Sequence, residues 1–166
     1  PATWNPAQRV TVTGASDDLA DGPQTTLVTV AVNDGASDNA YDTVADQTVS
    51  VTTADNDTAG FTIVQSDGST SVSENLTTDS FTVVLNAQPL SDVVLTVASG
   101  DTLEATASPA TLVFTPANWH TAQTVTVTGV NDDLADGPQT TLVTVAVNDS
   151  ASDNAFDNVA DQAGSV

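Results

Sequence analysis

The sequence contains no cysteine, no methionine and no lysine, and Arg9 is its one fixed positive charge against 22 acidic residues. Without cysteine, a disulfide framework cannot be the source of stability. The formal net charge of −21 repels nucleic acid and anionic lipid, so we expect neither as a partner. No apolar run approaches the roughly 18 residues that span a bilayer, so we expect no membrane insertion.

Strong acidity is common in disordered chains, but disorder also requires a shortage of apolar residues. Here 39% of the residues are hydrophobic, and valine alternates with threonine in several stretches. This pattern indicates a folded protein. Because self-repulsion destabilises a compact acidic chain, we expect salt or bound divalent cations to screen the charge.

An internal repeat dominates the sequence. Residues 1–47 return at 116–162, which sets a period of 115 residues, and 40 of the 51 positions aligned between 1–51 and 116–166 are identical. Solenoid repeats are much shorter, whereas this period is the size of one β-sandwich domain. We therefore predict that residues 1–56 are the C-terminal half of one repeat, with its last three strands. Residues 57–166 are then a nearly complete second repeat whose final strand is truncated.

Alternation with a period of two predicts the strands, and no segment has the period of an amphipathic helix. Seven strands separated by Gly, Pro, Asn and Asp turns predict an all-β, immunoglobulin-like antiparallel sandwich. The predicted strands are 60–65 continued by 70–73, then 80–86, 93–98, 103–115 broken by Pro109, 123–129 and 140–148, with the seventh visible in the first copy at 47–53.

Acidic loops should gather at one end of this sandwich, because alternate loops of an antiparallel sandwich share a pole. The pole at which the chain leaves the domain would collect Glu74, Asn75 and Asp79, then Asp101 and Glu104, then Asn131, Asp132, Asp133 and Asp136, and finally Asp55, Asn56 and Asp57. Calcium suits such a pole because it takes six to eight oxygen ligands in flexible geometry. Zinc and copper would require His or Cys. The alternative is that these residues only form turns.

The same segments resemble the Calx-beta domains of long bacterial surface proteins. The likeness is carried by SVSEN at 71–75, SGDTLEATASPATLVFTPANW at 99–119, QTVTVTGVNDDLADG at 123–137 and VSVTTADND at 49–57. The resemblance implies an immunoglobulin-like sandwich with calcium at one pole, although the NDD segment is shorter than the acidic runs of exchanger-type members. Together with the acidic pole and the first copy's counterparts, it makes the candidate metal ligands Glu74, Asp101, Asp132, Asp133, Asp136, Asp17, Asp18, Asp55 and Asp57.

A catalytic role is not expected. His120 is the only histidine, and Asn5 replaces it in the other copy, so a Ser-His-Asp arrangement has little support. Trp119 precedes a predicted strand, and a core or capping role is expected for it rather than stacking on a ligand. The aspartates at 149, 153, 157 and 161 lie at the opposite pole, where they are solvated turn residues or additional ligands at a junction between repeats.

These observations predict a calcium-binding extension repeat of a secreted or cell-surface, adhesin-like protein, of bacterial origin. One alternative is a subunit of an extracellular filament whose chains exchange strands or half-domains. Another is a module that binds carbohydrate or protein. In each case neighbouring copies of the repeat are the expected partners, because residues 1–56 lack a first half and must find one in cis or in trans. A terminal adhesive domain elsewhere in the parent chain would fit the first prediction.

Overall fold

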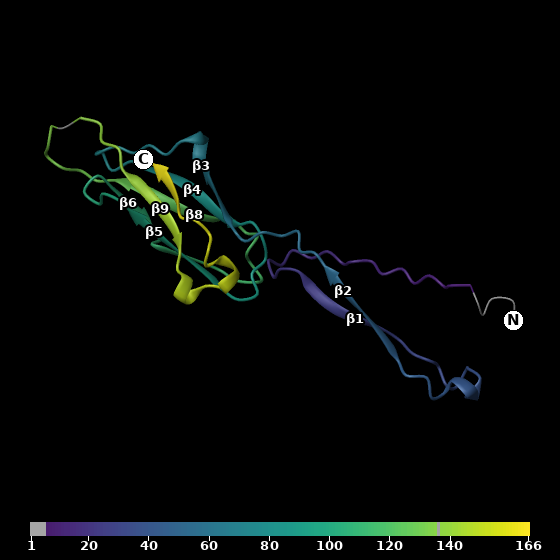
Figure 1. The fold of residues 1–166 in the computed structure, drawn as a ribbon. Helices are drawn as coiled ribbons and strands as arrows, with labels where there is room; N and C mark the ends of the chain where they lie inside the picture. Colours follow the sequence, from purple (N-terminus) through teal and green to yellow (C-terminus); the bar gives the residue numbers. More distant parts are fainter. Residues whose placement is uncertain (1–5, 136) are drawn as a thin grey trace. The chain divides into compact units, whose positions relative to one another are not determined.

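The computed structural model describes residues 6–135 and 137–166. Its chain forms two compact units, of which unit 1 covers residues 1–17 and 22–56, and unit 2 covers residues 18–21 and 57–166 (Figure 1). Helical structure in the described residues consists of short 3-10 turns, which are η1 (Asn39–Tyr41), η2 (Ser66–Gly68), η3 (Asp149–Ala151) and η4 (Asn154–Phe156). No helix in this part of the chain has the length and apolar character needed to cross a membrane.

Unit 2 is a sandwich of two antiparallel four-stranded sheets. One sheet has the order β3 (Phe61–Gln65), β4 (Thr78–Leu85), β8 (Gln123–Gly129) and β6 (Ala105–Ser108). The other has the order β10 (Gln162–Ser165), β9 (Leu142–Val147), β5 (Val93–Ser99) and β7 (Thr111–Phe114). Immunoglobulin domains place strands A, B, E and D in one sheet and C, F and G in the other, which is this order with β7 added beside β5. The predicted all-β, immunoglobulin-like fold is confirmed.

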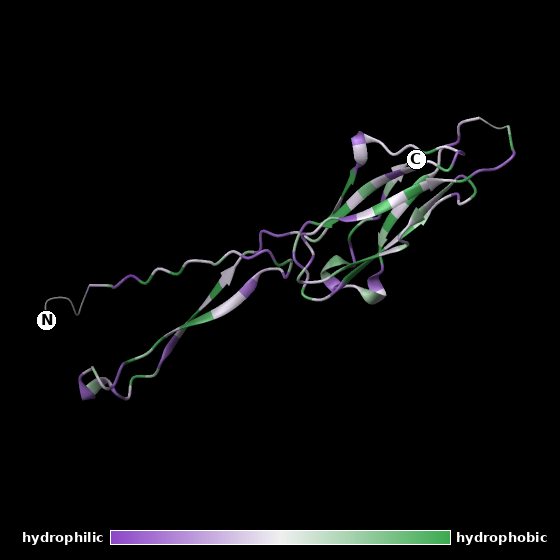
Figure 2. Cartoon of the chain, turned by 180° about the vertical axis from the view of Figure 1, so that it is seen from behind, coloured by the Kyte–Doolittle hydropathy of each residue, from purple (hydrophilic) through white to green (hydrophobic). Residues whose placement is uncertain are grey.

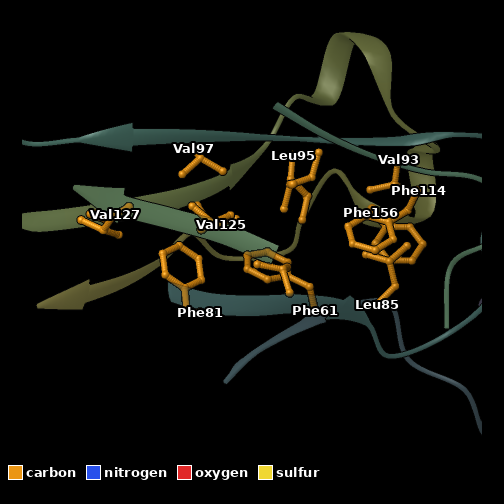
Figure 3. Packing of buried hydrophobic residues seen from close by; sticks show 14 of the residues in the cluster. Phe61, Phe81, Leu85, Val93, Leu95, Val97, Phe114, Val125, Val127 and Phe156 are labelled. Carbon is orange, nitrogen blue, oxygen red and sulfur yellow. The ribbon is translucent and has the colours of Figure 1, made fainter. Parts of the chain in front are cut away.

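The core of unit 2 comes from the inward positions of both sheets, as Figure 3 shows. Alternate residues of β4, β5, β8 and β9 are buried because successive side chains of a strand point to opposite faces. Trp119 packs against this cluster from the connection before β8, as expected. The largest side chains in the core are Phe61, Phe81, Leu85, Leu95, Leu112, Phe114 and Phe156.

The predicted strand 103–115 is two strands that belong to different sheets. β6 pairs with β8, whereas β7 pairs with β5. The change of sheet occurs at Pro109, which follows a cis peptide bond. Proline has no N–H to donate to a ladder, so the β6 pairing stops there and the chain is free to cross.

Residues 70–73 were expected to continue the first strand, and this expectation is wrong. They follow η2 and form no ladder, and side chains accept the N–H groups of two of these residues. The N–H of Ser71 donates to Asp79 Oδ2 at 2.8 Å, and the N–H of Ser73 donates to Thr77 Oγ1 at 2.8 Å. Short polar side chains thus replace the strand partner that this segment lacks.

The described part of unit 1 forms one hairpin, in which β1 (Gln24–Val30) pairs with β2 (Gln47–Thr53). Three strands were predicted in residues 1–56, but residues 8–14 form no strand. Their counterpart in unit 2 is β8, which lies between β4 and β6 and pairs with both. The described residues of unit 1 include no equivalent of β4 or β6, so residues 8–14 have no partners among them with which to form a ladder.

The chain enters and leaves unit 2 at opposite ends of the sandwich. It enters beside the turn after β4, where the N–H of Asn86 donates to the carbonyl of Gly60 at 2.9 Å. Its last strand, β10, runs toward the other end, where Val166 exchanges backbone hydrogen bonds of 2.9 and 3.0 Å with Thr141. Thr141 precedes β9 and lies among the loops at the other end.

Candidate functional site

Three loops of unit 2 surround a hollow of about 500 Å³ beside Val166, which we call the loop hollow. The loop between β3 and β4 contributes Glu74 and Asn75, the loop between β5 and β6 contributes Glu104, and the loop between β8 and β9 contributes Asn131. The predicted gathering of these loops at the end where the chain leaves the domain therefore agrees with the structure. Carboxylate and amide oxygens of this kind are ligands that calcium prefers.

The first of these loops is held by Asp79. Its carboxylate accepts hydrogen bonds from the Ser66 hydroxyl, from the N–H of Ser71 at 2.8 Å and from its neighbour Ser80 N–H at 2.7 Å. These donors favour the charged form and hold the pKa of Asp79 below its ordinary value. The Ser66 hydroxyl has the largest effect, followed by the N–H groups of Ser71 and Ser80. Asp79 therefore has a structural task, which is to fix the path of residues 66–71.

In the loops around the loop hollow, the predicted ligands Asp101, Asp132 and Asp133 lie outside the residues that line it. Asp101 Oδ1 accepts the N–H of Leu103 at 2.9 Å, and Asp132 Oδ1 accepts the N–H of Leu134 at 2.8 Å. Each of these carboxylates closes its own turn in this structure. Asp133 is exposed in the same loop as Asp132, and Asp136 lies outside the described residues. Among the described residues, Glu74 is the predicted ligand that borders the hollow, and Glu104 and Asn131 border it as well.

The remaining predicted ligands divide between the two units. Asp17 and Asp55 belong to unit 1, where Asp55 Oδ2 accepts the N–H of Gly22 at 2.7 Å. Asp18 and Asp57 belong to unit 2, where the carbonyl of Asp18 accepts the N–H of Gln88 at 2.7 Å. Nothing in this arrangement assigns them to the loop hollow.

The described residues contain no group of three or more His, Cys, Asp or Glu side chains placed to hold a metal ion together. The loop hollow therefore offers the right ligand chemistry from separate loops, without a preformed carboxylate cage. Calcium binding and its nine predicted ligands stay a prediction.

Sequence reasoning missed a buried carboxylate at the opposite pole. Asp153 is 8% exposed, and it accepts the N–H of Leu90 at 2.6 Å, Ser91 at 2.8 Å and Ala155 at 3.0 Å. Burial by itself would raise its pKa, but the N–H groups of Ala155, Ser91 and Leu90 together outweigh burial and lower it. Asp153 is thus a structural anchor between the turn before β5 and η4, and the expectation of a solvated turn residue or a junction ligand is wrong for it.

No protein-family model matches the chain, and no curated protein matches it. Among solved structures, SSP-19, an MSP-domain protein-like family member from Caenorhabditis elegans, has 16% identity and a TM-score of 0.38 over 59% of this chain and 89% of that one. Domains 4 and 5 of the S-layer protein SbsC have 16% identity and a TM-score of 0.39 over 73% of this chain and 61% of that one. The fold assignment follows from the strand order of unit 2 itself.

Proposed function

We propose that this chain is an extension repeat of an extracellular or cell-surface protein, and that its loop hollow binds calcium. The observation that carries the proposal is the placement of the two ends of unit 2. Because β3 begins beside Gly60 and β10 runs toward the opposite end of the sandwich, each added repeat lengthens an array. The eight residues of β4 alone span about 26 Å at roughly 3.3 Å per residue.

The repeat in the sequence supports a mechanical rather than a recognition role. The two copies share 40 of 51 aligned positions, and these positions include the core and the turns alike. An array of near-identical units provides length and spacing, whereas a dedicated binding site would be needed only once. The resemblance of the loop motifs to Calx-beta domains supports the same proposal and an extracellular location.

Calcium bound in the loop hollow would neutralise negative charge and link the loops that supply its ligands. Glu74 and Glu104 come from different loops, and Asn131 comes from a third, so one cation held by their oxygens would join all three. A formal net charge of −21 makes such neutralisation favourable. Binding to the folded state alone raises stability by mass action.

Thermal unfolding tests the proposal. Extracellular calcium modules have dissociation constants of about 10⁻⁴ M, so roughly 10 mM calcium should add about 2.7 kcal/mol of stability. For a unit of this size that corresponds to a rise in Tm of about 10 °C. The comparison is calcium against a chelator at matched ionic strength, with magnesium as a second control.

Paired substitutions locate the effect. Glu74→Gln combined with Glu104→Gln should remove most of the calcium-dependent rise. Asp149→Asn combined with Asp161→Asn changes the net charge equally at the opposite pole, where both side chains are exposed, and should leave it intact. Equal melting curves in calcium and chelator would contradict calcium binding, and equal losses in both double variants would contradict its placement.

A further inference from the structure

Unit 1 and the second half of unit 2 are nearly the same sequence in two different surroundings. The hairpin has the same register in both copies, since Val30 pairs with Gln47 as Val145 pairs with Gln162, 115 residues later. The turn is also preserved, because Asp38 caps η1 as Asp153 caps η4. The hairpin and turn of unit 1 therefore have the same local geometry as β9, η4 and β10. We call residues 1–51 and 116–166 the two copies of a half-sandwich, and the copy in unit 1 lacks the strands that cover its counterpart in unit 2.

Several apolar residues of residues 116–166 are buried in unit 2, whereas their counterparts in unit 1 are exposed. Val125 and Val127 in β8 are fully buried, whereas their counterparts Val10 and Val12 are 69% and 47% exposed. Phe156 is fully buried, and its counterpart Tyr41 is 59% exposed. Val145 is fully buried, and its counterpart Val30 is 55% exposed. Figure 2 shows the hydrophobic stretches that remain on the hairpin of unit 1.

Unit 2 shows what covers such a face. β8 is paired on one side by β4 and on the other by β6, while β9 is paired by β5. All three partners belong to residues 57–115, and this segment directly precedes the half-sandwich that it covers. The connection between the two is short, running from the end of β7 at Phe114 to the start of β8 at Gln123.

We propose that the apolar face of unit 1 binds a further copy of the segment 57–115, joined ahead of unit 1 in the same polypeptide as in unit 2. This segment would pair with residues 8–14 and with β1, and it would complete a second sandwich. The proposal rests on the tandem array of the proposed function and does not depend on calcium.

A second copy of the present chain is a poorer partner. Its segment 57–115 already covers residues 116–166 of its own unit 2. Lending that segment to another chain would expose as much apolar surface as it buries, so the exchange gains no hydrophobic free energy. An additional copy of the segment buries the apolar face of unit 1 without exposing apolar surface elsewhere.

Amide hydrogen exchange on the chain with and without the added segment tests this inference. Residues 8–14 give the decisive signal, because they form no ladder in unit 1 and their counterparts in β8 are paired on both sides. Placing a copy of 57–115 directly ahead of Pro1 should slow exchange at 10–14 by about 1,000-fold or more, as in a stably folded domain. The measurement is made in chelator, so that a failure of calcium binding does not affect it.

Two variants serve as matched controls in the extended chain. Leu95→Asp in the added copy alone should abolish the new protection, because Leu95 is fully buried in unit 2. Gly14→Ala should weaken the new protection without abolishing it, because a Cβ on its counterpart Gly129 would lie 2.2 Å from the carbonyl oxygen of Ser73. In the unextended chain a Cβ on Gly14 meets only the Thr53 side chain, at 3.0 Å. Protection at 123–129 should persist in both variants and shows that unit 2 is folded.

Unchanged exchange at 10–14 in the extended chain, with β8 protected, would overturn the proposal. It would also be overturned if the unextended chain already protected 10–14 as strongly as β8, whether as a monomer or through self-association seen by light scattering. Protection that appears only with the added segment, in a monomer, supports it.

Discussion

At the scale of single residues, identical side chains have different tasks in the two copies. Asp153 bridges the turn before β5 and η4, whereas its counterpart Asp38 is exposed and accepts the Ala40 N–H at 2.9 Å. The local sequence around both is SDNA, and the difference arises because Leu90 and Ser91 are present only in unit 2. The pair is therefore an internal comparison of a buried carboxylate with a solvated one.

We predict that Asp153→Asn destabilises unit 2 by roughly 1–3 kcal/mol, because an amide has one acceptor oxygen for three N–H donors and turns its NH₂ toward the others. Asp38→Asn should lower the free energy of unfolding by much less. Denaturant unfolding measures both. Because the folded pKa of Asp153 is lowered, its contribution is present above the unfolded pKa and is lost as the pH falls through the folded value. Equal losses of stability in the two variants would contradict the role of Asp153 as a structural anchor.

The glycines at 129 and 14 provide a second prediction. A methyl group at Gly129 would collide with the backbone of Ser73, so the β3–β4 loop would have to move. We expect Gly129→Ala to cost about 1–3 kcal/mol, and Gly14→Ala in the same chain to change the free energy of unfolding by less than about 0.5 kcal/mol. Urea titration of both variants measures the difference, and a harmless Gly129→Ala would contradict it.

At the scale of elements, the alternation of apolar and polar residues was sufficient to predict a strand where that strand has both a buried face and a partner strand. β5 and β8 begin at the predicted residues, and β8 also ends where expected. Residues 8–14 have the same alternation as β8 and form no strand, because strand formation also depends on partners that local sequence cannot supply. The change of sheet at Pro109 was likewise not predictable, since proline marks the interruption and not the direction taken after it.

The gathering of three acidic loops was predictable from the sequence, and the identity of the residues that border the hollow was less so. Loop alternation placed the acidic loops at one pole, and Glu74, Glu104 and Asn131 do border a single hollow. Asp101 and Asp132 were expected there as ligands, but an aspartate that closes its own turn has the same sequence signature as one that faces a cation.

The loop between β3 and β4 supplies a prediction at this scale. Asp79→Asn should loosen residues 66–71, because one carboxylate holds the Ser66 hydroxyl and the Ser71 N–H. In the unsubstituted protein the same loosening should occur as the pH falls through the lowered pKa of Asp79, and not above its ordinary value. The amide shifts of Ser71 and Ser80 report it by NMR titration. Shifts that already move at neutral pH would contradict the assignment.

At the scale of the whole molecule, the imbalance of charge is the strongest physical constraint. With 22 acids and one base, nearly every long-range interaction between side chains is repulsive. We predict that Tm rises steadily as sodium chloride increases from about 0.1 M to 1 M, over which the screening length falls from about 10 Å to 3 Å. Differential scanning calorimetry measures the rise. A Tm that is flat in salt would show that the fold already tolerates its charge.

The opposite placement of the two ends of unit 2 also determines how the sandwich carries a pulling force. The chain enters through β3 and leaves through β10, which are edge strands of different sheets. Tension between the ends therefore runs along both strands, while their hydrogen bonds to β4 and β9 lie across that direction. Ladders loaded in shear share the force among all their bonds and fail together, whereas bonds pulled open from one end break in succession. The outermost strands of the sandwich are thus its mechanical clamps.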